Sequence, residues 1–267
     1  MRVKRLVATL LVGVLALAAV ACGSSSKSSK LQNTDDTFVV GFDQNFPPFG
    51  YVDDNGEYTG FDIELAQEVA KRLDMECVLQ PIDWDAKDLE LEAGTIDCIW
   101  NGFTMNGRED SYTWSDPYMN NSQVFVVRED SGINSEEDLA GKIVDVQKES
   151  SAETALNEDD MASLTGSFSQ LISVADYNTA MMDLESGAVD AVAMDKFVAL
   201  DQINGKEDTY KILDYEISSE QYGVGFALGN TDLRDKVNKI LKEMNEDGTF
   251  AEISEKWFGT DVSILGK

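Results

Sequence analysis

Two patterns of apolar positions alternate along most of the chain. Short runs rich in β-branched and aromatic residues are followed by segments whose apolar residues recur every three or four positions. The first pattern predicts buried strands and the second predicts amphipathic helices. We predict strands at 37–42, 76–81, 97–100, 143–146, 170–174 and 190–193, and helices at 61–73, 86–93, 152–157, 179–185 and 196–202. An Asn-Gly hairpin is predicted at 51–58, and two more helices at 233–245 and 250–257.

This alternation is typical of α/β folds, in which helices cover both faces of mostly parallel sheets. The segment 91–99 is similar to 184–192: each has a helix end, a glycine, and an aspartate leading into a buried strand. The repeat favours two lobes built alike, each a doubly wound, mostly parallel sheet, joined by two crossover strands in the β-rich segments 123–127 and 220–228. The predicted boundaries are 37–124 plus 221–267 for lobe 1, on which the last two helices pack, and 125–220 for lobe 2.

The N-terminus reads as an export signal. Residues 1–21 carry three basic side chains and then an apolar run of 16 residues, which is short for a membrane span of about 20. Small residues, Cys22 and a serine-rich stretch follow, and they resemble the lipobox of bacterial lipoproteins. We therefore predict a lipoprotein signal peptide at 1–21, lipidation of Cys22 and a flexible tether at 22–36. The protein is expected outside the cytoplasm, touching the cell membrane only through its lipid.

Composition excludes several functions. The 267 residues include 21 Lys and Arg and 50 Asp and Glu, which gives a net charge of −29. Phosphate repels so negative a surface, so no nucleic acid partner is expected. The chain has no histidine, which excludes Ser-His-Asp triads, Cys-His nucleophiles and HExxH zinc sites. We therefore expect a binding protein without cofactor or metal site.

Two cysteines remain besides Cys22. Cys77 and Cys98 lie in the second and third predicted strands. In a doubly wound sheet the first strand lies between these two, so their separation of about 9.6 Å exceeds the roughly 7 Å limit for a disulfide. We predict two buried free thiols.

Charged residues of opposite sign follow the predicted strands, where a ligand between two α/β lobes would bind. Arg108 can hold a carboxylate through two parallel hydrogen bonds, and Asp195 can hold an ammonium. Ser150 and Ser151, at a helix start, add donors for the same anion. A free amino acid presents both charges, and the aromatic rings that could flank its side chain are Phe46 and Trp84.

Each of these residues also has a simpler interpretation. Arg108 could be a surface cation paired with Glu109 or Asp110 beside it. Asp195 could cap a helix, and Ser150 could be an ordinary residue at a helix start. Phe46 and Trp84 could belong to the core.

Several motifs resemble those of the bacterial extracellular solute-binding family 3, the polar amino acid receptors of ABC importers. They are Gly60-Phe61-Asp62-Ile63-Glu64-Leu65-Ala66-Gln67-Glu68-Val69-Ala70, Phe46-Pro47-Pro48-Phe49, Asn101-Gly102-Phe103-Thr104 followed by Arg108, Ser115-Asp116-Pro117-Tyr118 and Trp257-Phe258-Gly259. The resemblance covers about residues 37–259. It implies the type II periplasmic-binding-protein fold, whose two lobes close on an L-amino acid, and an ABC permease as partner; a monomer is expected.

The resemblance also implies roles for single residues. It places Arg108 on the α-carboxylate and Asp195 on the α-ammonium, with Gly102 and Thr104 as further contacts. The chain departs from the family twice. One residue fewer separates the threonine from the arginine, so this loop must be tighter. Glu149 stands where members often have glycine, and we expect it to point to solvent.

The predicted site leaves the ligand's side chain open. Gln147 and Asn101 suit glutamine or cystine, whereas Asp43 suits a cationic side chain; Asn45 would also influence the choice. Two other functions remain: a dehydratase-like enzyme using Asp43 as acid or base, and a ligand-binding sensor. The full set of predicted ligand-binding residues is Asp43, Phe46, Trp84, Asn101, Gly102, Thr104, Arg108, Gln147, Ser150, Ser151, Met194 and Asp195.

Overall fold

The computed structural model describes residues 36–267. The predicted signal peptide, Cys22 and the tether up to residue 35 lie outside the described residues. Within the described chain, no helix combines the length and the apolar character needed to cross a bilayer.

Lobe 1 is built on a five-stranded sheet with the strand order β5-β1-β6-β13-β7. The first three strands run parallel, and β13 pairs antiparallel with both of its neighbours. The predicted hairpin is present as part of a small antiparallel sheet, β2-β3-β4. The strands are β1 (Thr37–Phe42), β2 (Asn45–Phe46), β3 (Gly50–Val52), β4 (Tyr58–Thr59), β5 (Glu76–Pro81), β6 (Cys98–Ile99), β7 (Thr113–Trp114) and β13 (Gly225–Phe226).

Lobe 2 is built on a second five-stranded sheet, with the order β10-β9-β11-β8-β12. Here too the first three strands are parallel, while β8 and β12 are antiparallel to the strand beside them. The strands are β8 (Met119–Arg128), β9 (Ile143–Gln147), β10 (Gln170–Val174), β11 (Ala191–Asp195) and β12 (Tyr210–Tyr222). Each lobe is therefore a mixed sheet with a parallel half, as the alternating pattern predicts.

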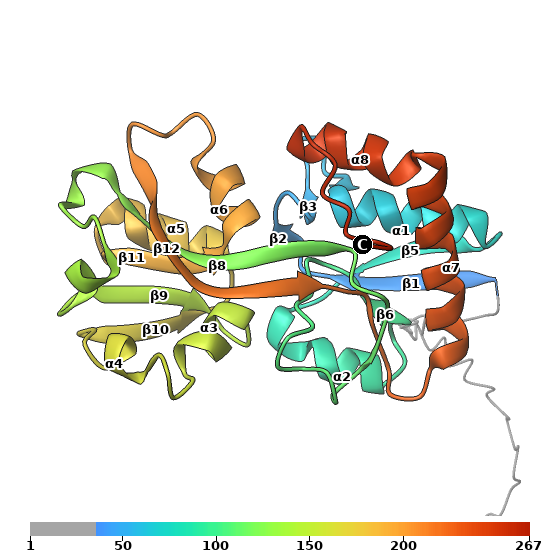
Figure 1. The fold of residues 1–267 in the computed structure, drawn as a ribbon, viewed down its shortest axis with the longest axis horizontal. Helices are drawn as coiled ribbons and strands as arrows, with labels where there is room; N and C mark the ends of the chain where they lie inside the picture. Colours follow the sequence, from blue (N-terminus) through green and yellow to red (C-terminus); the bar gives the residue numbers. More distant parts are fainter. Residues whose placement is uncertain (1–35) are drawn as a thin grey trace, which may run out of the picture. The chain divides into compact units, whose positions relative to one another are not determined.

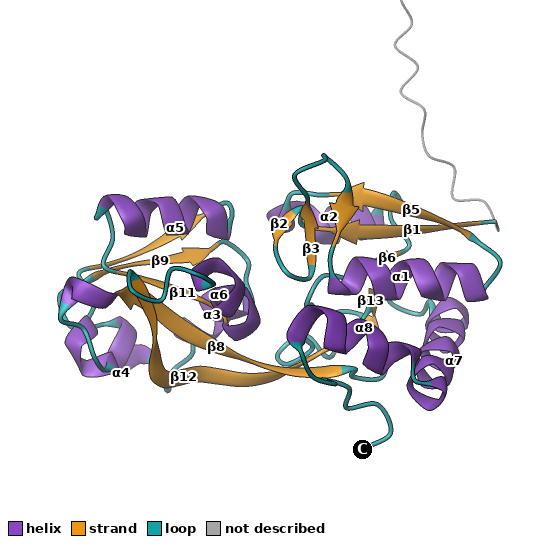
Figure 2. Ribbon diagram, turned by 90° about the horizontal axis from the view of Figure 1, so that it is seen from above, coloured by secondary structure: helices purple, strands orange, loops and turns teal. Residues whose placement is uncertain are grey.

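Helices cover both faces of each sheet (Figures 1 and 2). In lobe 1, α1 packs with the two C-terminal helices α7 and α8, as expected, and α2 lies across the sheet from α1. In lobe 2, α5 and α6 lie on one side and α3 and α4 on the other. The helices are α1 (Phe61–Arg72), η1 (Trp84–Ala86), α2 (Lys87–Glu92), η2 (Glu129–Ser131), η3 (Glu136–Leu139), α3 (Ser151–Leu156), α4 (Ala162–Thr165), α5 (Tyr177–Ser186), α6 (Lys196–Ile203), α7 (Thr231–Asp247) and α8 (Thr249–Phe258).

The repeated segment has the same structural role in both lobes. Asp97 accepts a hydrogen bond from the backbone N–H of Val39 at 2.7 Å. Asp190 accepts one from the backbone N–H of Ile143 at 3.0 Å. Both aspartates therefore tie the third parallel strand of a lobe to its first strand.

The two crossing strands are longer than predicted. Figure 1 shows β8 and β12 running together from lobe 2 toward lobe 1. The prediction of one crossing at 220–228 is wrong, because β12 already starts at Tyr210 and ends before β13. The pattern misses residues 210–219 because the strand carries register shifts and exposes much of one side, which breaks the apolar alternation.

Both cysteines of the described chain are free. β1 separates β5 from β6, which is the predicted reason. The expectation of burial holds for Cys98, but Cys77 is only half-buried, since it lies on the edge strand β5.

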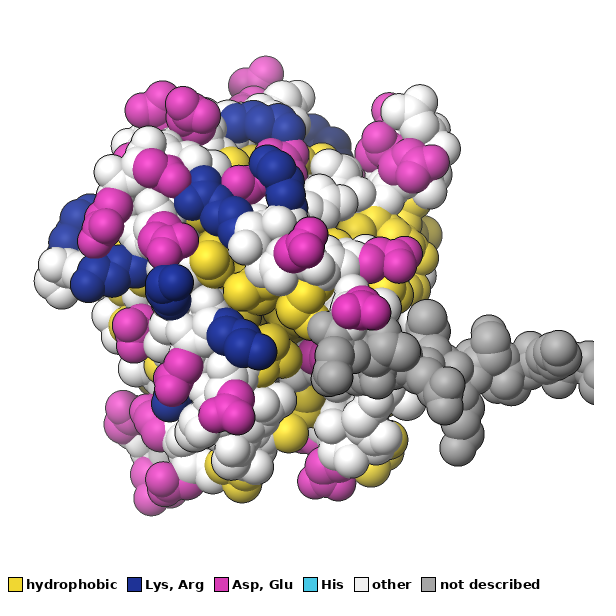
Figure 3. All heavy atoms as spheres, turned by 90° about the vertical axis from the view of Figure 1, so that its right-hand side faces the viewer, with side chains coloured by type: hydrophobic (Ala, Val, Ile, Leu, Met, Phe, Trp, Pro, Cys, Tyr) yellow, Lys and Arg dark blue, Asp and Glu magenta, His cyan; other side chains and the backbone are white. Residues whose placement is uncertain are grey.

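Acidic side chains do not dominate every face of the molecule. Figure 3 shows the end of lobe 1 near α7, where basic and acidic side chains are interspersed around apolar patches.

Candidate ligand-binding site

A small cavity lies between the carboxyl ends of the parallel strands of both lobes. It is lined by ten of the twelve predicted site residues: Phe46, Trp84, Asn101, Gly102, Thr104, Arg108, Gln147, Ser150, Ser151 and Asp195. The loops after β1, β5 and β6 supply the residues of lobe 1, and β9, β11 and the start of α3 supply those of lobe 2. Residues widely spaced in the sequence are thus brought to one place by the topology.

Two predicted residues do not line this cavity. Met194 is fully buried in the hydrophobic core. Successive side chains of a strand point to opposite faces, so Met194 must face away from the side that its neighbour Asp195 presents to the cavity. Asp43 lies just behind the cavity wall, where its carboxylate accepts a hydrogen bond from the Gln147 side chain at 2.8 Å.

Arg108 links the two lobes across the cavity. Its guanidinium donates to the carbonyl oxygen of Thr104 at 3.2 Å and to that of Glu149 at 3.1 Å. It also stacks 5.3 Å from the ring centre of Phe103. Within the described residues it forms no ion pair, so its acidic neighbours in the sequence are not its partners. Arg108 is therefore a cation held by neutral acceptors.

The other ionisable residue in the lining is a buried acid. Asp195 is 4 % exposed. Its Oδ1 accepts hydrogen bonds from the hydroxyl of Tyr222 and, at 2.8 Å, from the amide of Asn121. Although Asp195 precedes α6, its side chain does not cap that helix. The simpler interpretation of Asp195 as a helix cap is therefore wrong.

Gly102 is positioned by a buried carboxylate. Asp62, in the first turn of α1, accepts the backbone N–H of Gly102 and, at 2.9 Å, the hydroxyl of Tyr118. Complete burial raises the pKa of Asp62 to about 7. Because the Gly102 N–H is already bonded, its carbonyl oxygen is the main-chain group left for a ligand, and a carbonyl suits an ammonium.

The start of α3 supplies hydroxyl groups. Ser150 caps the helix by accepting the backbone N–H of Glu153 at 3.0 Å, which leaves its own O–H free to donate elsewhere. Glu149 is exposed, and its φ of 59° lies in the left-handed region that favours glycine. This conformation explains why members of the family that the sequence resembles often have glycine at this position. Glu149 adopts it with some backbone strain.

Residues 38–260 match the bacterial extracellular solute-binding proteins, family 3. The chain belongs to this family. The L-cystine-binding protein TcyJ of Escherichia coli is 35 % identical over 95 % of this chain and 96 % of its own. A structure titled as an ABC uptake transporter substrate-binding protein from Streptococcus pneumoniae with bound histidine has a TM-score of 0.82 at 33 % identity, covering 86 % of this chain and 95 % of that one. The structure of Tv2483 bound to L-arginine has a TM-score of 0.82 at 29 % identity, over 87 % and 94 %.

This family 3 protein has its lobes closed. The cavity measures about 10 Å³, whereas a single water molecule needs roughly 10–15 Å³. Trp84 reaches across and donates its indole N–H to the carbonyl oxygen of Glu149 at 3.3 Å. An amino acid can therefore enter only if the two sides move apart.

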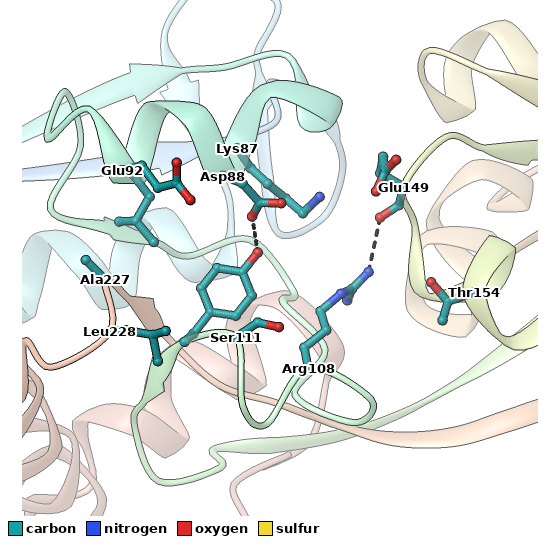
Figure 4. Close-up of a pocket in the computed structure, with 11 residues that line it drawn as sticks. Lys87, Asp88, Glu92, Arg108, Ser111, Glu149, Thr154, Ala227 and Leu228 are labelled. Carbon is teal, nitrogen blue, oxygen red and sulfur yellow. Dashed lines mark hydrogen bonds between the residues drawn. The ribbon is translucent and has the colours of Figure 1, made fainter.

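Larger openings flank the closed cavity. One, of about 500 Å³, is lined by Arg108, Glu149 and residues of α2, and Figure 4 shows Arg108 extended across it toward Glu149. Lys87 lines it as well: its side chain is 3 % exposed, its ammonium lies 5.4 Å from the ring centre of Trp84, and within residues 36–267 it forms no ion pair.

The opening on the opposite side is acidic. It measures about 620 Å³, and its lining includes Asp43, Asp83, Asp85 and Asp176, with Lys148 as its one basic side chain. Asn45, which was expected to influence ligand choice, lines this opening rather than the central cavity. The family 3 protein thus presents negative charge beside the end of the cavity where Asp43 lies.

Sequence reasoning did not single out one buried acid beside the cavity of this family 3 protein. Glu220, on the crossing strand β12, is 4 % exposed and shares the amide donor of Asn121 with Asp195. No sequence signal indicated it, because an acid among polar residues of a half-exposed strand resembles an ordinary surface residue.

Proposed function

We propose that the protein binds a polar L-amino acid in the cavity between its lobes and delivers it to an ABC import permease. One observation carries the proposal: Arg108 of lobe 1, a cation, and Asp195 of lobe 2, a buried acid, line the same cavity. An α-carboxylate and an α-ammonium would satisfy both. Charge-assisted hydrogen bonds contribute roughly 1.5–3 kcal/mol each, so three or four of them could supply the about 8 kcal/mol of a micromolar complex.

The acids beside Asp43 favour a ligand with a second cationic group. Burial raises the pKa of Asp43, so this carboxylate would be stabilised by a nearby cation. Arginine, lysine and ornithine carry such a group, and cystine carries a second ammonium. The Escherichia coli relative is named for cystine and Tv2483 was solved with L-arginine, which agrees with this choice over glutamine.

A thermal-shift screen followed by calorimetry tests the function. The twenty amino acids, ornithine and cystine are screened first, because a ligand of the native state raises the melting temperature. Binding of the best compound is then measured for R108A and R108K. We expect R108A to weaken binding by roughly 100-fold or more, because it leaves the carboxylate without its charged partner, and R108K to rescue only part of this loss.

R234A serves as the matched control, because Arg234 lies on α7 and bonds to Asp235 and the Trp114 carbonyl, away from the cavity. It should bind as the unmodified protein does. Unchanged affinity in R108A would remove the proposed mechanism.

The same proposal covers several features besides the cavity. We propose the signal peptide at 1–21, the lipid on Cys22, the tether at 22–36, the lobe boundaries given above and a monomeric receptor held outside the cytoplasm by its lipid. We also propose binding without catalysis: Asp43, the candidate acid or base, is engaged with Gln147 and the backbone N–H of Asn45.

A further inference from the structure

Two buried carboxylates lie side by side next to the ligand cavity. Asp195 and Glu220 are each 4 % exposed. One amide group, Nδ2 of Asn121, donates to both, at 2.8 Å to Asp195 and at 2.6 Å to Glu220. Neither acid forms an ion pair within the described part of the chain.

We propose that Glu220 is the second acid of the ammonium subsite, and that Asp195 and Glu220 share one proton that the ammonium of the ligand displaces. The inference rests on the proposed function. It adds an acid on the crossing strand β12 that lines the opening next to the cavity, together with Arg108 and Ser151, and it makes binding release a proton.

Like charges explain the shared proton. Two carboxylates within reach of one amide, both removed from water, cannot both ionise without a counter-charge. Glu220 also accepts hydrogen bonds from the Gln123 amide at 2.7 Å and from the hydroxyl of Ser151. The proton is therefore held on Asp195, whose pKa is raised well above its usual range by burial and then by the charge of Glu220.

The step balances in charge and protons. Before binding, the pair holds one proton and one negative charge. The ligand enters as –NH₃⁺ and keeps its three protons, while the carboxyl proton of Asp195 leaves to water. The pair then carries two negative charges and the ligand one positive charge, so the net charge of the subsite is unchanged.

Other titratable groups lie around the pair. Tyr222 of β12 and Tyr177 of α5 are both fully buried, and the pKa of each is raised far out of the neutral range. The guanidinium of Arg108 lines the same cavity as Asp195. Asp43 and Asp62 also have raised pKa values. The test therefore compares the unmodified protein with a variant in which both of these acids are retained.

The variant is E220Q, which keeps the shape and the acceptor for Asn121 but removes the second charge. E216Q is the matched control: Glu216 lies on the same strand, is exposed and pairs with Lys196 at 3.1 Å. Calorimetry at pH 6 to 8.5, in buffers of different ionisation enthalpy, counts the protons released. The probe is whichever of the twenty amino acids, ornithine or cystine gives the largest thermal shift.

The unmodified protein and E216Q should release about one proton per ligand at pH 6, and their affinity should rise about tenfold per pH unit until the pair has lost its proton. E220Q should release fewer protons, bind with little dependence on pH and be roughly tenfold weaker in the alkaline limit. An equal proton count and pH profile in E220Q would overturn the proposal.

Two other results of these measurements would also decide the question. If E220Q does not fold, a count of zero protons for the unmodified protein overturns the proposal and a count near one supports it. If the unmodified protein binds none of the probes, the proposed function itself fails; binding without proton release leaves that function standing and refutes only the shared proton.

Discussion

Asp62 should make the stability of the protein fall as the pH rises, and D62N should remove that dependence. The carboxyl group is fully buried, and its pKa in the folded protein is raised from 3.8 to about 7. Folding therefore favours the protonated form. The resulting stabilisation is complete below the unfolded pKa and is lost as the pH rises through the folded pKa.

The magnitude follows from the two pKa values. Between them the stability changes by about 1.4 kcal/mol per pH unit. From pH 5 to pH 8 the unmodified protein should lose about 3 kcal/mol through this one group. Asparagine does not titrate, so the stability advantage of the unmodified protein over D62N should shrink by the same amount over that range.

Urea unfolding at pH 5, 6.5 and 8 measures the effect. Other buried acids, including Asp195, contribute the same sign in both proteins, so only the difference between them is interpreted. E64Q is the control: Glu64 lies in the same helical turn, is only partly buried and pairs with Lys256 at the surface. Its effect should stay within about 0.5 kcal/mol at each pH. Parallel pH profiles for D62N and the unmodified protein would refute the reasoning.

Two further predictions concern the edge of the cavity. E149G should stabilise the protein by about 0.5–1 kcal/mol in thermal unfolding, because glycine accepts the φ of 59° without strain; E149A, which retains a Cβ, should give no gain. K148A breaks the ion pair between Lys148 and Asp85 across the lobes, whose side chains are 54 % and 44 % exposed. Calorimetry should show at most about a fivefold change in amino acid affinity, since exposed pairs contribute roughly 0–1 kcal/mol; a change as large as that of R108A would contradict this.

The parts of the fold that the sequence predicted are those where local pattern and tertiary role agree. The predicted strand at 170–174 coincides with β10, and the repeated aspartates, Asp97 and Asp190, each reach the first strand of their lobe. In these segments the apolar spacing reflects one buried face. The spacing of apolar residues along the chain is then sufficient to predict the element.

The parts that it missed depend on contacts between distant segments. The start of β12 is half-exposed and is defined by pairing with β8, which no local period records. The sequence predicts Met194 in the site because it follows the predicted strand at 190–193, yet strand alternation turns its side chain into the core. Glu220 became visible only when the fold brought it beside Asp195.

The closed arrangement is held by the groups that a ligand would use. Arg108 donates to one carbonyl oxygen in each lobe, Thr104 and Glu149, and the indole of Trp84 donates to the same Glu149 oxygen. A ligand carboxylate would replace neutral acceptors of the guanidinium with charged ones, which can bind it through two parallel hydrogen bonds. The affinity is therefore a difference between these bonds and the contacts that the protein makes with itself. It follows that loss of Arg108 weakens both the bound state and the closed one, whereas loss of Glu220 should change only the bound state.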